Sequence, residues 1–230
     1  MKLAVFTSNQ PRHIALLDAL TGAGHDVVAV IEPKTWLLPE SSIMAAYWSK
    51  VREAELYLFG QPYFALCRSM AFRSGELSKS WYALPGAVWD RRPIVFSSSY
   101  LTGSLANYLI ERGAFNLHVG IAPEYRGSAP NMWAQYDGNP HLIGAQVQRL
   151  SKGLDAGDIL AEVRPPAPVT GDYFTRSMLA VKLGIEAMVR LLATPEPWTP
   201  VRANDRTKRL RFARHADFTD DVAAKIMEGA

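Results

Sequence analysis

The N-terminal stretch up to Ile31 alternates between two short apolar runs and one segment with helical spacing. Leu3 to Phe6 is predicted to be a strand, the apolar residues from Ile14 to Leu20 recur every three or four positions, and Asp26 to Ile31 is a second strand. A helix between two strands this close in sequence is typical of a βαβ unit, whose strands lie parallel in one sheet. We therefore expect an α/β fold with a Rossmann-like, open and mostly parallel sheet and helices on both faces.

The rest of the chain continues the alternation of helical and extended patterns. We expect strands at Ile94 to Phe96, Ala114 to His118 and Gly144 to Leu150, and helices at Ile43 to Phe59, Leu105 to Arg112, Met132 to Tyr136, Tyr173 to Leu192 and Phe218 to Met227. Residues 60 to 90 are aromatic and irregular, and no element is assigned to them. The length of 230 residues favours one principal domain.

Composition places the chain among ordinary globular proteins. Of its 230 residues 48% are hydrophobic and 20% are charged, and the formal net charge is +3. Cys67 is the only cysteine, which excludes an intramolecular disulfide and a thiolate-rich zinc site and suggests a buried structural thiol. No run approaches the roughly 20 apolar residues of a membrane span, and no signal peptide is recognisable. A cytoplasmic location is expected.

Asn116 and His118 are two residues apart in the strand predicted to end at His118. Side chains two apart in a strand point to the same face, so these two are neighbours while Leu117 points into apolar packing. A carboxamide beside an imidazole joins a neutral hydrogen-bond donor to a group that exchanges protons near physiological pH. That pair suits an oxyanion intermediate. The alternative is that Asn116 caps a turn and His118 is a hydrogen-bonded core histidine.

Two glycines bracket Asp155 in the segment from Gly153 to Gly157. Glycines at this spacing shape a loop. On spacing alone, Asp155 binds a metal, caps a turn or orients a histidine, and the turn is the commonest of the three. Asp158 is the one other carboxylate beside it, which makes a weak ligand set for a metal ion.

Three segments together resemble the folate-dependent formyltransferase family. The segments are Asn116-Leu117-His118, Pro123-Glu124-Tyr125-Arg126-Gly127-Ser128-Ala129-Pro130, and Leu154-Asp155-Ala156-Gly157-Asp158-Ile159-Leu160. Their order, content and spacing agree with the family's Asn-x-His strand end, its Leu-Pro-x-Tyr/Phe-Arg/Lys-Gly loop and its Asp-x-Gly segment. The resemblance covers residues 94 to 161 and implies the fold and the donor more firmly than the acceptor.

The resemblance implies that Asn116, His118 and Asp155 are catalytic and that N10-formyltetrahydrofolate is the formyl donor. An amine attacks the formyl carbon, and the negative charge that grows on the formyl oxygen is stabilised by donors from Asn116 and His118. Asp155 holds His118 in orientation and helps to move a proton from the attacking nitrogen to the departing folate nitrogen. No metal is expected.

The resemblance also implies where the pterin binds. In the family it enters between the loop before the Asn-x-His strand and the loop that carries the aspartate, which are here Ser99-Tyr100-Leu101 and Gly153-Leu154. Main-chain groups pair with the pterin edge, and the two leucines supply apolar walls. Where many members have His-Pro-Ser-Leu-Leu-Pro, this chain has His118-Val119-Gly120-Ile121-Ala122-Pro123, so we expect a different loop shape after the histidine.

The acceptor is argued by comparison within the family. The turn from Thr7 to Arg12 lacks the glycine-rich phosphate loop of the glycinamide ribonucleotide enzymes. Too few residues follow Trp198 for the carboxy-terminal β-barrel of the methionyl-tRNA enzymes. We therefore expect a primary amine on a small molecule, with a nucleotide-linked amino sugar first. Tyr125 and Arg126 are assigned to substrate binding, and the alternative for Arg126 is to pin its loop through backbone carbonyls.

Several other functions stay open on the sequence. They are a formyltransferase of the glycinamide ribonucleotide or methionyl-tRNA type, a formyltetrahydrofolate hydrolase and a catalytically silent folate-binding protein. Residues 1–198 are expected to form the catalytic domain, and 199–230 a short basic C-terminal extension that is solvated or contacts phosphate. A membrane or nucleic-acid partner is not expected, and a homodimer is left open.

Overall fold

The computed structural model describes residues 1–35, 39–61, 67–166 and 172–229. It contains an α/β core built on a seven-stranded sheet in the order β3-β2-β1-β4-β5-β7-β8. The pairs from β3 to β5 are parallel, and β7 and β8 join antiparallel at one edge. In chain order the strands are β1 (Lys2–Thr7), β2 (Asp26–Ile31), β3 (Arg68–Ala71), β4 (Arg92–Val95), β5 (Phe115–His118), β7 (Ala145–Arg149) and β8 (Ile159–Val163). The Rossmann-like, mostly parallel sheet predicted from the sequence is confirmed.

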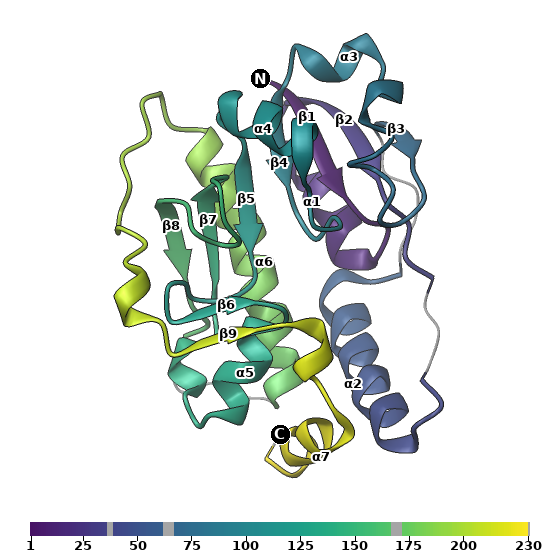
Figure 1. Ribbon diagram of the computed structural model, residues 1–230, viewed down its shortest axis with the longest axis vertical. Helices are drawn as coiled ribbons and strands as arrows, with labels where there is room; N and C mark the ends of the chain where they lie inside the picture. Colours follow the sequence, from purple (N-terminus) through teal and green to yellow (C-terminus); the bar gives the residue numbers. More distant parts are fainter. Residues whose placement is uncertain (36–38, 62–66, 167–171, 230) are drawn as a thin grey trace.

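Helices cover both faces of the sheet (Figure 1). Alternation along β1 separates the two faces, since Leu3 and Val5 belong to one apolar cluster and Ala4 and Phe6 to the other. The first face carries α1 (Pro11–Gly22), α2 (Ser42–Phe59) and α6 (Tyr173–Leu192), and the second carries α3 (Gly86–Trp89) and α4 (Gly103–Glu111).

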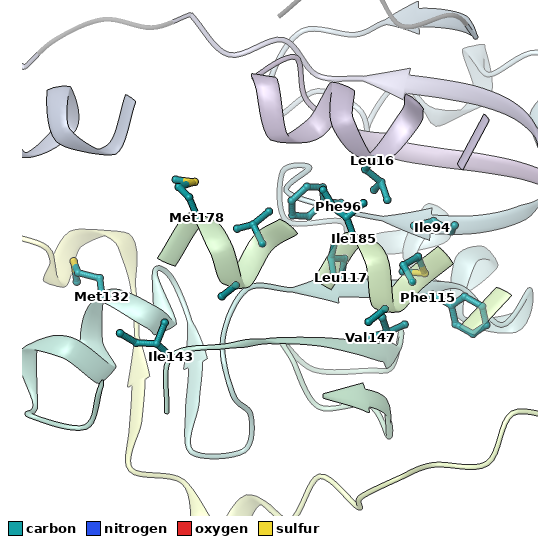
Figure 2. Packing of buried hydrophobic residues seen from close by; sticks show 14 of the residues in the cluster. Leu16, Ile94, Phe96, Phe115, Leu117, Met132, Ile143, Val147, Met178 and Ile185 are labelled. Carbon is teal, nitrogen blue, oxygen red and sulfur yellow. The ribbon is translucent and has the colours of Figure 1, made fainter. Parts of the chain in front are cut away.

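The long helix α6 is central to the larger cluster. Figure 2 shows Ile185 of α6 between Leu16 of α1 and Leu117 of β5, all of them buried. Asp172 caps its N-terminus, because the Asp172 carboxylate accepts a hydrogen bond from the Thr175 amide at 2.7 Å. The sequence-predicted bounds of α6 match those in the structure. Packing against α6 thus fixes the position of β5 and of its carboxyl end.

A second, two-stranded sheet joins the middle of the chain to its C-terminal segment. β6 (Tyr125–Gly127) pairs in parallel with β9 (Arg211–Ala213), which runs alongside it in Figure 1. The helices α5 (Pro130–Tyr136) and α7 (Asp220–Glu228) pack nearby. Four single turns of 3-10 helix complete the described elements: η1 (Trp81–Ala83), η2 (Pro140–Leu142), η3 (Arg206–Lys208) and η4 (His215–Asp217).

Some expectations differ from the structure. Cys67 is half-buried at the edge of the core and not the fully buried thiol expected, because it precedes the exposed edge strand β3. Burial nevertheless raises the pKa of its thiol. The expected strand at Ile94 begins earlier, at Arg92, and the C-terminal helix begins at Asp220. Among the described residues, no helix combines the length and apolarity needed to cross a membrane.

Candidate active site

The site lies where β4 and β5 end side by side. Val95 is in register with Asn116, so the loop that follows β4 meets the end of β5. Carboxyl ends of parallel strands form the crevice in which open α/β sheets bind ligands. A cavity of about 990 Å³ opens there.

Strand geometry turns Asn116 and His118 toward this cavity. Their neighbours Phe115 and Leu117 are buried in the cluster that contains α6. Asn116 and His118 point the other way and both line the cavity, Asn116 half-buried and His118 buried. The alternation expected from the sequence is therefore present. His118 is buried and hydrogen-bonded, as the alternative role of a core histidine requires. It also lines the cavity, which that role does not explain.

Asp155 reaches His118 from a loop between β7 and β8. The Nδ1 atom of His118 lies 3.1 Å from Oδ1 of Asp155, and both side chains are more than nine-tenths buried. The second carboxylate oxygen, Oδ2, accepts a hydrogen bond from the Gly127 amide at 2.9 Å. Asp155 has a left-handed backbone with φ of 49°, which costs a residue other than glycine on the order of 1 kcal/mol. The loop is thus shaped to aim this carboxylate.

Both ring nitrogens of His118 face oxygen. Nδ1 faces Asp155, and Nε2 lies 3.3 Å from the Tyr125 carbonyl oxygen. A carbonyl oxygen only accepts hydrogen bonds, so the doubly protonated ring satisfies both contacts and a neutral ring only one. Burial lowers the pKa of His118, but the charge and hydrogen bond of Asp155, with the Tyr125 carbonyl, more than offset it and hold the pKa above its usual value.

The carboxylate of Asp155 is held in its ionised form. Burial alone raises its pKa, whereas the charge and hydrogen bond of His118, the Gly127 amide and the charge of Arg126 lower it, with the net result below the usual range. An ionised carboxylate against a protonated imidazole makes a polar pair that orients the ring and supplies an N–H donor to the cavity edge. Such a pair, beside a carboxamide, is able to stabilise an oxyanion and exchange a proton.

Tyr125 and Arg126 lie behind the site and do not reach the cavity lining. Tyr125 is fully buried, and its hydroxyl donates to Asp137 Oδ2 at 3.2 Å and accepts from Asn139 at 2.8 Å. The buried guanidinium of Arg126 donates to the Leu154 carbonyl from Nε at 3.1 Å and also from NH2. The substrate-binding roles expected for Tyr125 and Arg126 stay predictions. The contacts of Arg126 with the Leu154 carbonyl hold the loop that carries Asp155.

All five residues expected around the pterin line the cavity: Ser99, Tyr100, Leu101, Gly153 and Leu154. The buried carboxylate of Glu32 fixes Ser99, whose amide donates to Oε2 at 2.7 Å and whose hydroxyl donates to Oε1 at 2.9 Å. Since that amide is already engaged, it is not free to pair with a pterin edge. The binding roles of these residues stay predictions.

Sequence reasoning missed part of the cavity wall. Arg12 and Lys34 line it, as do the aromatic side chains of Tyr47, Trp48 and Tyr173 from α2 and α6. None of these residues belongs to a motif, and helical spacing predicts Tyr47 only as a core residue. Their place in the sequence was the one available signal. Arg12 and Lys34 follow the ends of β1 and β2, where open α/β sheets bind ligands.

The described residues contain no group of three or more His, Cys, Asp or Glu side chains arranged to hold a metal ion. The expectation that the chemistry needs no metal stays a prediction.

The sequence of residues 100–180 matches the model of the formyl transferase family. Methionyl-tRNA formyltransferase of Agathobacter rectalis is 25% identical over 221 residues, covering 94% of this chain and 67% of that protein. The same enzyme of Acidobacterium capsulatum is 31% identical over 206 residues, covering 86% and 60%. These matches support a place in the folate-dependent formyltransferase family. It spans about three fifths to two thirds of the length of these relatives.

Solved structures of formyltransferases share the fold. One, described as a likely sugar N-formyltransferase from Mycobacterium tuberculosis, has a TM-score of 0.58 at 15% identity and covers 95% of this chain and 77% of its own. The N-formyltransferase of Helicobacter canadensis, solved with folinic acid and dTDP-3-aminofucose, has a TM-score of 0.52 at 11% identity, with 98% and 79% covered. At these identities the likeness concerns the formyltransferase fold alone.

Proposed function

We propose that this formyltransferase moves the formyl group of N10-formyltetrahydrofolate to a primary amine of a small acceptor, with nucleotide-linked amino sugars as the first acceptor class. One observation carries the proposal. The buried His118–Asp155 contact stands beside Asn116 on the wall of a large cavity at the sheet's carboxyl edge.

The three residues divide the chemistry. As the acceptor amine attacks the formyl carbon, the C–N bond that forms pushes charge onto the formyl oxygen. Asn116 donates a hydrogen bond to that oxygen, and protonated His118 donates to it from Nε2, which exchanges the Tyr125 carbonyl for the formyl oxygen. Asp155 keeps the imidazole charged and oriented. The attacking nitrogen loses a proton, directly or through water, and N10 gains one as the C–N10 bond breaks. The products are a formamide and tetrahydrofolate.

The cavity has two ends that lie on opposite faces of the sheet. Leu101 packs with the cluster that holds α4, whereas Tyr47 packs with the cluster that holds α6, and both line the cavity. We name the end at Leu101 and Leu154 the donor side, because apolar walls suit a pterin. The end at Arg12, Lys34 and Tyr47 is then the acceptor side. Asn116 and His118 lie on the strand end that both sides share.

The chemistry of the acceptor side favours an anionic substrate with a flat ring. Arg12 is neutralised by Glu55 at 2.7 Å, but no carboxylate among the described residues lies within ion-pair distance of Lys34. Lys34 donates to the Ser97 carbonyl at 3.3 Å. Desolvation lowers its pKa, and Arg12 lowers it further while Glu32 opposes them. A phosphate would relieve this crowding of cations, and the aromatic side chains offer surfaces on which a base or sugar stacks.

The structural neighbours add support of a different kind. The Helicobacter canadensis protein was solved with folinic acid and a dTDP-linked amino sugar, which are a folate and an acceptor of the proposed classes. The sequence relatives point elsewhere, since they are methionyl-tRNA formyltransferases. Methionyl-tRNA is therefore the second candidate acceptor.

A panel of acceptors separates these candidates. The purified protein is incubated with N10-formyltetrahydrofolate and, in turn, dTDP- and UDP-linked amino sugars, glycinamide ribonucleotide, methionyl-tRNA or no acceptor, and tetrahydrofolate and the formylated product are measured. We expect product with a nucleotide-linked amino sugar and none without an acceptor. Tetrahydrofolate and formate in the blank indicate a hydrolase, and turnover with methionyl-tRNA alone indicates the second candidate. No turnover with any acceptor contradicts the proposal.

A further inference from the structure

The C-terminal segment from Arg202 to Ala213 lies along the back of the catalytic loop. Asn204 donates from its Nδ2 to the Asp155 carbonyl at 2.8 Å and to the Gly157 carbonyl at 3.0 Å. Both partners are acceptors, so the amide nitrogen must face the loop. One side chain therefore holds the backbone on both sides of Ala156.

The same segment also fixes the group that holds the Asp155 carboxylate. Gly127, whose amide donates to Asp155 Oδ2, is paired with Ala213 between β6 and β9. The Ser128 amide donates to the Ala213 carbonyl at 2.9 Å. A Cβ on Gly127 would lie 2.1 Å from that carbonyl oxygen, so the two backbones approach as closely as glycine allows. Asp155 is thus fixed by the C-terminal segment at its backbone and, through Gly127, at its carboxylate.

We propose that Asn204 is a positioning residue, which holds Asp155 in the left-handed conformation that lets one carboxylate reach both His118 and Gly127. The inference rests on the proposed function for its effect on turnover. It changes the part assigned to residues 199–230, because a segment expected to be a basic extension becomes a structural element of the active site. Nothing in the motifs of residues 94–161 implies this role.

Loss of the Asn204 amide has a consequence at His118 that a general loss of stability lacks. The charged groups that act on the His118 ring are Asp155, which favours the protonated form, and Arg126, which disfavours it, and the Tyr125 carbonyl adds a hydrogen bond. When the loop relaxes, Asp155 withdraws while the buried ring and Arg126 remain. The pKa of His118 then falls.

The test compares the full chain with Asn204→Ala and Asn204→Ser, and uses Lys208→Ala as a control on an exposed residue of the same segment. We expect Asn204→Ala to lower kcat roughly 10-fold with little change in either KM, since small displacements of catalytic groups are costly. The alkaline limb of the pH profile moves to lower pH. Asn204→Ser, which keeps a short hydroxyl donor, lies between, and Lys208→Ala matches the parent.

A second measurement does not depend on turnover. The His118 ring is titrated by NMR in the parent, in Asn204→Ser and in Asn204→Ala, and we expect its pKa to fall in the variants. An unchanged His118 pKa, or a loss of kcat without a shift of the alkaline limb, overturns the inference and leaves Asn204 a stabilising residue. If the parent transfers no formyl group, the proposed function fails, and the titration still decides the role of Asn204. If Asn204→Ala does not fold, Asn204→Ser carries both measurements.

Discussion

The Nδ1 atom of His118 and the Oδ1 atom of Asp155 lie 3.1 Å apart, although one residue ends a strand of the sheet and the other belongs to a loop between antiparallel strands. Their contact is buried, and the opposite ring nitrogen of His118 faces the Tyr125 carbonyl. This arrangement favours a positively charged imidazole at the cavity wall. The charge state of His118 is therefore the property that experiments should examine first.

Replacing Asp155 by Asn should shift the pH dependence of the reaction. With the carboxylate gone, only the Tyr125 carbonyl still opposes the effects of burial and Arg126 on His118, so the pKa of His118 falls. The active form in the proposed mechanism is the protonated ring, and activity is lost as pH rises through its pKa. The alkaline limb of kcat/KM should then move to lower pH, which a profile at several pH values measures.

Asp158→Asn is the matched control for this variant. Asp158 is an exposed carboxylate three residues further along the same loop, and its removal should leave the alkaline limb in place. An alkaline limb that is identical in Asp155→Asn and the parent would mean that another group controls it.

Truncation of the two donors should reduce turnover more than binding. In the proposed mechanism, Asn116→Ala and His118→Ala each remove a group that acts on the formyl oxygen only as charge develops there, so kcat should fall on the order of 100-fold or more. Folate affinity, measured by fluorescence or calorimetry, should change far less. His141→Ala removes an exposed histidine and should behave as the parent, whereas full activity in His118→Ala would contradict the mechanism.

Regular elements with a buried face were predictable from the sequence. The strand β2 and the helix α6 have the bounds expected, since alternation or helical spacing runs through their whole length. The strand β3 was not predictable, because three of its four residues are exposed and the fourth only half-buried, which leaves no apolar alternation to detect. Burial on a face creates the pattern, and edge strands lack it.

The residues of the candidate site were likewise predictable only where a regular pattern or a motif marks them. Strand alternation alone turns Asn116 and His118 to one face, and the family resemblance brings in Asp155 from a distant loop. The positions of Arg126 and Asn204 depend on hydrogen bonds to backbone carbonyls of that loop. Such bonds leave no residue-type signal, because any carbonyl serves as the acceptor. For that reason the sequence leaves Arg126 open between a substrate contact and a loop contact, and it indicates no role for Asn204.

Gly120, two residues after His118, should be intolerant of substitution. A Cβ on Gly120 would lie 2.3 Å from Cβ of Pro130 and 2.9 Å from Nε2 of His118, so a serine there displaces the ring or the loop. Gly120→Ser should lower kcat roughly 10- to 100-fold. Gly22→Ala, at a helix end where an added Cβ would meet no atom within 4 Å beyond its own helix backbone and chain neighbours, should leave the kinetics unchanged. Parent-like activity in Gly120→Ser would show that the loop adapts without moving His118.

Lys34 should discriminate between phosphorylated and uncharged acceptors. It lines the acceptor side and has no carboxylate partner among the described residues, so Lys34→Met removes a charge without leaving an unpaired anion. A charge-assisted hydrogen bond contributes about 1.5 to 3 kcal/mol, and KM for a nucleotide-linked amino sugar should rise at least roughly 10-fold, while KM for the donor stays constant. Lys50→Met, on the exposed side of α2, is the control. Equal KM values for the acceptor in Lys34→Met and the parent would exclude a contact between Lys34 and the acceptor phosphate. That phosphate would then have to bind elsewhere along the cavity.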